Sequence, residues 1–178
     1  MKKSLKVWQF AGFIFTVIAG VLLHFIFDWT GNSILVAAFS AVNESIFEHT
    51  KLLFFPMFIF ALVQNCYIGR EYGDFWCIKL IGIVSGVILI PVLYYTINGV
   101  FGNMPDWVNI AIFFVTAAFS YTIERLLFNY WSVNCNCPQI AFFVLCLLTV
   151  TFMVFTFFAP NIPFFQDPIT GTYGYINQ

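Results

Sequence analysis

Both histidines of this chain and three of its eight carboxylates fall in two short stretches within its first third. The stretches are HFIFDW at residues 24–29 and VNESIFEHTK at residues 42–51. His24 and Asp28 are four residues apart, and Glu44, Glu48 and Lys51 follow the spacing i, i+4, i+7. On a helix, such spacings place side chains on one face. The two stretches therefore predict two polar walls of one site.

Histidine nitrogens and carboxylate oxygens are ligands of zinc, manganese and iron, and an i, i+4 pair lets one helix supply two of them. The predicted metal ligands are His24, Asp28, Glu44, Glu48 and His49. A wider set that could bind a ligand or relay protons adds Asn43, Ser45, Lys51, Asp167, Thr170 and Tyr173. The cofactor expected for the five predicted metal ligands is a divalent metal, zinc or manganese.

The composition places these residues in a membrane protein. Of the 178 residues, 61% are hydrophobic and 8% are charged, whereas soluble domains carry roughly 25% charged residues. The net charge of −1 offers no basic surface for phosphates, which argues against nucleic-acid binding. The expected partners are the lipid bilayer, a small molecule or ion, and other membrane proteins.

Five apolar stretches approach the roughly 20 residues that a membrane-spanning helix needs. They are residues 7–29, 52–68, 77–97, 107–124 and 139–159. We expect the second helix to begin near Glu44 with Asn43 as its N-cap, and Pro56 and Pro91 to kink the second and third helices. The predicted fold is all-α and polytopic, with a transmembrane domain at 1–159 and a turn-rich tail at 160–178.

Residues 33–42 (SILVAAFSAV) form a sixth apolar stretch that is too short to cross a bilayer. It predicts a re-entrant or interfacial helix. A second hypothesis extends this stretch through the polar residues 42–51 as one full span, which would bury Glu44, Ser45 and Glu48 within it.

The positive charges predict the orientation, because cytoplasmic flanks retain Lys and Arg. With the N-terminus inside, the cytoplasmic side carries Lys2, Lys3, Lys6, Arg70, Lys79 and Arg125, and the outer side carries Lys51. The two polar stretches and the tail then lie outside. The five cysteines fall on the cytoplasmic side or in the cytoplasmic half, where none needs an oxidising compartment. Cys135 and Cys137 form a CxC pattern that could bind a soft metal or cycle through a disulfide, but we expect both to be reduced and unpaired.

Three functions compete for the polar stretches. The first is binding or transport of a small polar or cationic solute, because ionisable groups at membrane depth are functional candidates. The second is a metal-dependent membrane hydrolase acting near lipid headgroups, with Glu44 or Glu48 as general base and Lys51 stabilising the developing anion. The third is a structural subunit without chemistry, in which Asp28, Glu44, Glu48 and Lys51 pair and dock residues 33–42.

The tail also has two interpretations. Asp167 before Pro168, and Thr170 before Gly171, fit ordinary turn chemistry. Alternatively, Phe164 and Phe165 rest on the membrane surface and hold Asp167, Thr170 and Tyr173 over the site as a lid.

Other residues predict contacts rather than chemistry. Gly82 and Gly86 form a GxxxG pattern that fits either packing within the chain or a homo-oligomer or membrane partner. Glu124 is interpreted as a cytoplasmic anchor that could pair with Arg70 or Lys79.

The motifs NESIFEHTK at 43–51 and DPITGTYG at 167–174 resemble a family of small bacterial integral membrane proteins of unknown function. The likeness covers the whole chain, although members often carry Trp at the position of Phe47. It implies a polytopic membrane fold in a bacterial, Gram-positive cell membrane. It implies no activity.

Overall fold

The computed structural model of the chain describes residues 3–102, 105, 107–130 and 133–175. Five long helices make up the bundle: α1 (Lys3–Trp29), α3 (Ile46–Ile68), α4 (Phe75–Phe101), α5 (Trp107–Asn129) and α6 (Pro138–Phe157). Each is long and apolar enough to cross a membrane. The predicted all-α polytopic fold with five spans is therefore confirmed.

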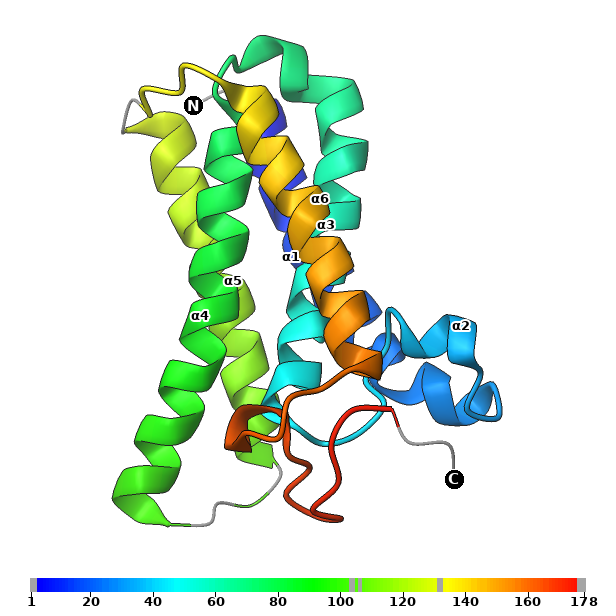
Figure 1. Cartoon of the computed structure of the whole chain (residues 1–178). Coiled ribbons are helices and arrows are strands. Elements are labelled where there is room, and N and C mark those ends of the chain that lie inside the picture. Colours follow the sequence, from blue (N-terminus) through cyan, green and yellow to red (C-terminus); the bar gives the residue numbers. More distant parts are fainter. Residues whose placement is uncertain (1–2, 103–104, 106, 131–132, 176–178) are drawn as a thin grey trace.

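Three short helices complete the described chain: α2 (Ile34–Ala37), and the 3₁₀ turns η1 (Gly69–Glu71) and η2 (Pro163–Phe165). Helix α2 lies beside the end of α1, at the end of the bundle that also carries the C-terminal tail (Figure 1). The chain is not helical between Ser40 and Ser45. The hypothesis of one continuous span through residues 33–51 is therefore wrong.

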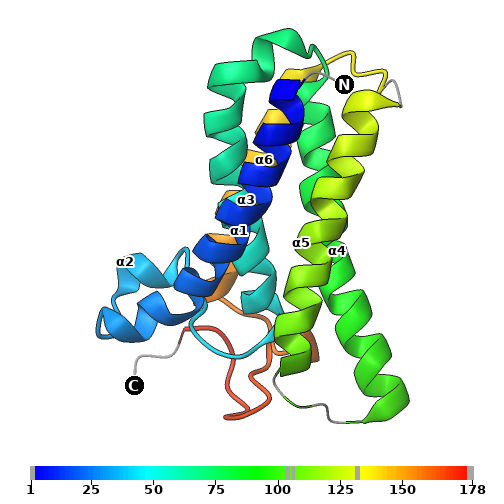
Figure 2. The same ribbon diagram turned by 180° about the vertical axis from the view of Figure 1, so that it is seen from behind.

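Helix α3 is the centre of the bundle. It packs against α1, α4, α5 and α6, and Figures 1 and 2 show its first half among these helices and its second half at the edge of the bundle. Its buried phenylalanines, such as Phe54 and Phe55, contact Phe152 of α6, with ring centroids 4.8 and 6.2 Å apart. This burial suits the middle of α3, residues 52–63, which is apolar on every side.

The GxxxG pattern lies in the contact between α4 and α5. A Cβ atom on Gly82 would meet the side chain of Glu124, and one on Gly86 would meet Ser120. Both glycines are buried. They allow two helices of this chain to approach closely, which is the intramolecular alternative that the sequence left open.

The start of α3 differs from the expected one. Ser45 is the N-cap, and its hydroxyl accepts a hydrogen bond from the Glu48 N–H at 3.4 Å. Asn43 instead lies before the cap, and its side-chain oxygen accepts a bond from the Ser45 N–H at 2.9 Å. The predictions of Asn43 as the cap and of a helix from Glu44 were wrong, because Asn and Ser are nearly equal as caps.

The tail folds back onto the bundle. Phe165 is buried, and its ring centroid is 4.5 Å from that of Phe47. Phe164 also contacts Phe47. This aromatic pair therefore packs on protein, whereas the lid hypothesis placed it on the membrane surface. Gly174 has a φ of +59°, and its carbonyl accepts a bond from the Asn43 side chain at 3.2 Å. The tail thereby holds the loop before α3.

A disulfide joins Cys77, in the first turn of α4, to Cys135, just before α6. The expectation that Cys135 is unpaired was therefore wrong. The sequence separation of 58 residues hid the pairing. The other three cysteines, Cys66, Cys137 and Cys146, are free.

Candidate metal site

His24, Glu44 and His49 come together at one end of the bundle, from α1, from the loop before α3 and from the first turns of α3. The His24 Nε2 lies 3.7 Å from a Glu44 carboxylate oxygen, and the His49 Nε2 lies 3.5 Å from the other oxygen. One ligand atom from each residue can be chosen so that all three lie within 4.8 Å of one another. The three side chains are half-buried, with exposed fractions of 20–41%.

The spacing of these atoms suits an ion between them. Both distances exceed the 2.7–3.2 Å of an N–H···O hydrogen bond. A tetrahedral zinc ion with bonds of about 2.0–2.1 Å holds its N and O ligands about 3.3 Å apart. The two short distances reach different oxygens of Glu44, and one ligand atom from each residue lies within 4.8 Å of the others. The cluster is therefore wider than a loaded zinc site, and its side chains would have to move inward to form one.

His49 is oriented for this role by the backbone. Its Nδ1 lies 2.9 Å from the carbonyl oxygen of Ser45. A carbonyl can only accept, so Nδ1 carries the proton and Nε2 presents its lone pair towards Glu44. Metal-binding histidines are commonly fixed in this way by a backbone carbonyl. The His24 Nδ1 is buried and has no hydrogen-bond partner among the described residues, so the backbone does not fix this ring in the same way.

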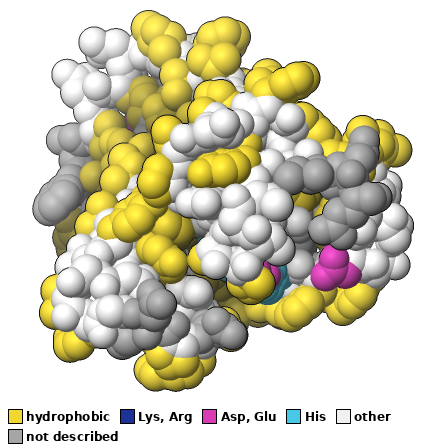
Figure 3. All heavy atoms as spheres, turned by 60° about the horizontal axis from the view of Figure 1, so that its bottom comes forward, with side chains coloured by type: hydrophobic (Ala, Val, Ile, Leu, Met, Phe, Trp, Pro, Cys, Tyr) yellow, Lys and Arg dark blue, Asp and Glu magenta, His cyan; other side chains and the backbone are white. Residues whose placement is uncertain are grey.

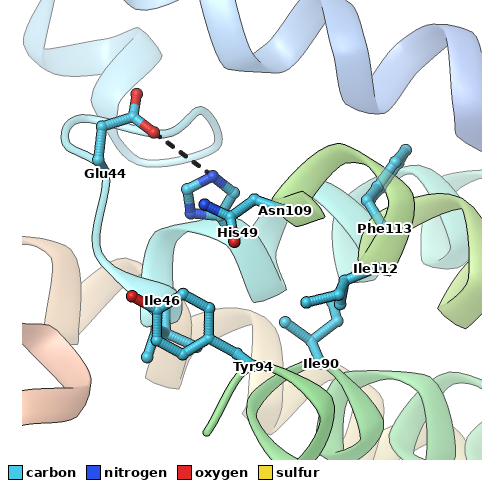
Figure 4. Close-up of a pocket in the computed structure, with 8 residues that line it drawn as sticks. All are labelled: Glu44, Ile46, His49, Ile90, Tyr94, Asn109, Ile112 and Phe113. Carbon is cyan, nitrogen blue, oxygen red and sulfur yellow. Dashed lines mark ion pairs between the residues drawn. The ribbon is translucent and has the colours of Figure 1, made fainter. Parts of the chain in front are cut away.

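Two adjoining cavities open at the cluster. The larger has a volume of about 120 Å³ and is lined by residues that include His24, Glu44, His49 and Asn109. The smaller shares Glu44, His49 and Asn109 and extends towards Tyr94 and Ile90 of α4 (Figure 4). Viewed from this end, histidine and acidic atoms show side by side among apolar side chains (Figure 3). An ion in the cluster would thus have space for a further ligand.

Asn109, in the first turn of α5, was not predicted as a site residue. Its amide can donate or accept hydrogen bonds at the cavity wall. The sequence signal that could have indicated Asn109 is a polar residue near the start of an otherwise apolar span. That signal is weak, because polar residues are common where helices enter a membrane.

Glu48 and Lys51 belong to a second, buried cluster. The Lys51 Nζ lies 2.6 Å from a Glu48 oxygen and donates to the Ala37 carbonyl at 3.1 Å and to the Thr156 hydroxyl at 2.7 Å. Glu48 also accepts a bond from the Val42 N–H at 3.1 Å. The pair thus ties both α2 and the loop that follows it to α3. The structural hypothesis predicted that paired charges dock residues 33–42 onto the bundle. Glu48 and Lys51 do so, but Glu44 and Asp28 are not part of this cluster.

The other predicted site residues lie outside the metal cluster. Asp28 is exposed on α1. Asp167 accepts bonds from the Ile169 N–H and the Thr170 hydroxyl, both at 2.8 Å, which is turn chemistry. Tyr173 forms a β-bridge with Gln166. Asp167, Thr170 and Tyr173 do not line either cavity at the cluster.

A third polar cluster lies inside the bundle, nearer the other end. The Lys79 Nζ donates to a Glu124 oxygen at 2.6 Å, and both side chains are fully buried. Lys79 was one of the two partners expected for Glu124, but Glu124 was expected to lie at the cytoplasmic membrane surface. The Glu124 side chain instead packs over Gly82 of α4.

Comparison with known proteins gives one match. The sequence model of a family of unknown function, DUF6512, matches residues 1–175. The predicted likeness to a family of unknown function along the chain is confirmed. No curated protein and no solved structure matches the chain.

Proposed function

Because the chain belongs to DUF6512, a family of unknown function, we propose its function from the site alone: it binds a divalent transition-metal ion of the zinc type. The proposed ligands are His24, Glu44 and His49. The supporting observation is the spacing of 3.5 and 3.7 Å between the histidine nitrogens and the Glu44 oxygens, together with the bond that orients His49.

The ligand types favour zinc over magnesium or calcium. Imidazole suits zinc and its neighbours, whereas magnesium and calcium prefer oxygen ligands alone. Two imidazoles and one carboxylate leave a fourth tetrahedral position for water or a solute. The cavity beside the cluster, with Asn109 in its wall, supplies space for that ligand. Under this proposal, the small cationic solute predicted from the sequence is a metal ion.

A metal-dependent hydrolase is a weaker candidate. Three ligands with an open fourth position are also the arrangement of catalytic zinc sites. However, Glu48 and Lys51, the predicted base and anion-stabilising group, are buried and bonded to each other. No other described carboxylate lines the two cavities besides Glu44, which is itself a proposed ligand. Binding is therefore the function that the arrangement supports best.

Metal analysis of the purified full chain in detergent tests the proposal. After loading with zinc and desalting, we expect stoichiometric metal in the wild type. His24→Ala, His49→Ala and Glu44→Gln should each weaken binding by more than roughly 10-fold, the lower end of what loss of a supporting outer residue costs. Asp28→Asn is the matched control, because Asp28 is a nearby but exposed carboxylate.

The outcomes are distinct. Folded wild-type protein that takes up no zinc or manganese would refute metal binding. Equal loss of metal in Asp28→Asn would show that the ion sits elsewhere. Zinc uptake into liposomes containing the protein would extend binding to transport, whereas binding without uptake would indicate capture.

We propose that the N-terminus is cytoplasmic and that the metal site faces outward. The support is the distribution of Lys and Arg, most of which lie at the N-terminal end of α1, near η1 and at the end of α5. The exposed tail residue Ile169 offers a test. An Ile169→Cys variant should react with a membrane-impermeant maleimide in intact cells. Labelling only after lysis would reverse the orientation.

A further inference from the structure

A groove between α1 and α5 lies towards the opposite end of the bundle from the metal cluster. The two helices pack side by side, as the view from behind shows (Figure 2). The groove has a volume of about 340 Å³. The residues that matter for its chemistry are Lys6, Gln9, Phe10, Phe13, Tyr121 and Arg125.

The charge of the groove is positive. Lys6 and Arg125 line it from opposite helices, and both are exposed. No carboxylate lines the groove, because the neighbouring Glu124 is buried against Lys79. Neither Lys6 nor Arg125 forms an ion pair with another described residue. Two uncompensated cations thus face one cavity.

The inner wall of the groove carries an unsatisfied polar group. Gln9 is 5% exposed, and neither atom of its amide makes a hydrogen bond of good geometry within the described chain, although the amide lies beside Glu124. The Glu124 carboxylate can accept only from the amide nitrogen, so the amide oxygen is left without a donor, and an unpaired buried acceptor is costly. The Tyr121 hydroxyl, at the same wall, is engaged with Thr16 at 2.9 Å. Gln9 is therefore the group that a ligand in the groove would satisfy.

The surroundings of the groove are apolar. Phe10 and Phe13 line it, and Phe10 is 67% exposed. Further along the same two helices, Ile18 of α1 and Val115 of α5 are also exposed. In a helix that crosses a bilayer, such side chains face the acyl chains of lipids. A ligand that fits this site therefore has an anionic end and an apolar remainder.

We propose that the groove binds an anionic phospholipid, with its phosphate headgroup between Lys6 and Arg125 and with a polar headgroup atom on the Gln9 amide. Basic pockets between transmembrane helices bind anionic headgroups in this way, and each cation near the membrane surface strengthens the interaction. The site is separate from the metal cluster. It does not depend on the proposed function.

Lipid binding to the purified full chain tests the proposal. Native mass spectrometry in detergent compares phosphatidylglycerol with phosphatidylcholine of the same acyl chains. We expect the wild type to prefer phosphatidylglycerol. Lys6→Gln and Arg125→Gln should each weaken this binding by about 5-fold, and the double variant by about 30-fold. Arg70→Gln is the matched control, because Arg70 is an exposed cation near the same end but outside the groove.

Two further measurements sharpen the result. Gln9→Leu leaves the charges unchanged and should weaken phosphatidylglycerol binding while preserving thermal stability in the absence of lipid. Inorganic phosphate at millimolar concentration should compete weakly, since it lacks the apolar part. Equal binding of the two lipids, an equal loss in Arg70→Gln, or full displacement by inorganic phosphate would each overturn the proposal.

Discussion

The buried pair Lys79–Glu124 gives a sharp test of the interior of the bundle. The Lys79 nitrogen and the Glu124 oxygen are 2.6 Å apart, and neither side chain is more than 1% exposed. At an effective dielectric constant of about 20, the attraction at this distance is about 6 kcal/mol. The loss of hydration on burial cancels much of that gain. Replacing one partner, however, leaves the other as an uncompensated buried charge.

We expect Lys79→Met to lower the free energy of unfolding by about 3–5 kcal/mol. Glu124→Leu should cost a similar amount. The double variant Lys79→Met/Glu124→Leu should recover most of the loss, because apolar replacement of both members of a buried pair is often neutral or stabilising. A double-mutant cycle, measured by denaturant titration in detergent micelles, yields the coupling between the two residues.

Lys6→Met is the control, because Lys6 is an exposed lysine on α1. Its effect should stay within about 0.5 kcal/mol. A cost below about 1 kcal/mol for Lys79→Met would refute the reasoning, since that is the value of an exposed ion pair. A double variant as unstable as the sum of the singles would do the same.

Three further predictions concern packing, the second cluster and the metal. Gly86→Val should lower the unfolding free energy by about 1–3 kcal/mol, because its side chain would meet Ser120, and unchanged thermal stability would contradict this. Thr156→Val should cost about 1 kcal/mol by removing an acceptor from Lys51, whereas Thr149→Val, whose hydroxyl bonds only its own helix, should cost less. Bound zinc should be released as the pH falls from about 7.5 to 5, because imidazole ligands must be deprotonated, and retention at pH 5 in a dialysis assay would argue against histidine ligands.

The five spans could be predicted because each is a long apolar run, and length alone separates a span from a short helix. The same criterion correctly excluded residues 33–42 as a span. Helix ends were less predictable. Asn43 and Ser45 are both good caps, and only the bond from the Glu48 N–H to Ser45 decides between them.

That shift of two residues changed the site. With α3 beginning at Ile46, Glu44 is no longer on the helix, so it does not share a face with Glu48 and Lys51. Glu44 turns to the two histidines, while Glu48 and Lys51 turn inward. The residue types around Glu44 were therefore predictable. The separation of Glu44 and the two histidines from the buried Glu48–Lys51 pair was not. Asn109, which is more than 50 residues further along the chain, depended on how α5 packs.

The Cys77–Cys135 disulfide makes a last prediction about orientation. Both cysteines lie at the end of the bundle where α1 begins and α5 ends, which is the cytoplasmic end in the proposed orientation. The cytosol keeps thiols reduced. If the proposed orientation holds, the pair that forms the disulfide in the structure is a dithiol in intact cells and closes on oxidation.

Differential alkylation measures this state. A membrane-permeant maleimide is added to cells before lysis, and a second, heavier reagent is added after reduction. Cys77 and Cys135 should carry the first reagent, as should the exposed free Cys137, which serves as the internal reference. If Cys77 and Cys135 carry only the second reagent while Cys137 carries the first, this end faces an oxidising compartment. His24, Glu44 and His49 would then face the cytoplasm, and a metal bound there as proposed would come from the cell interior.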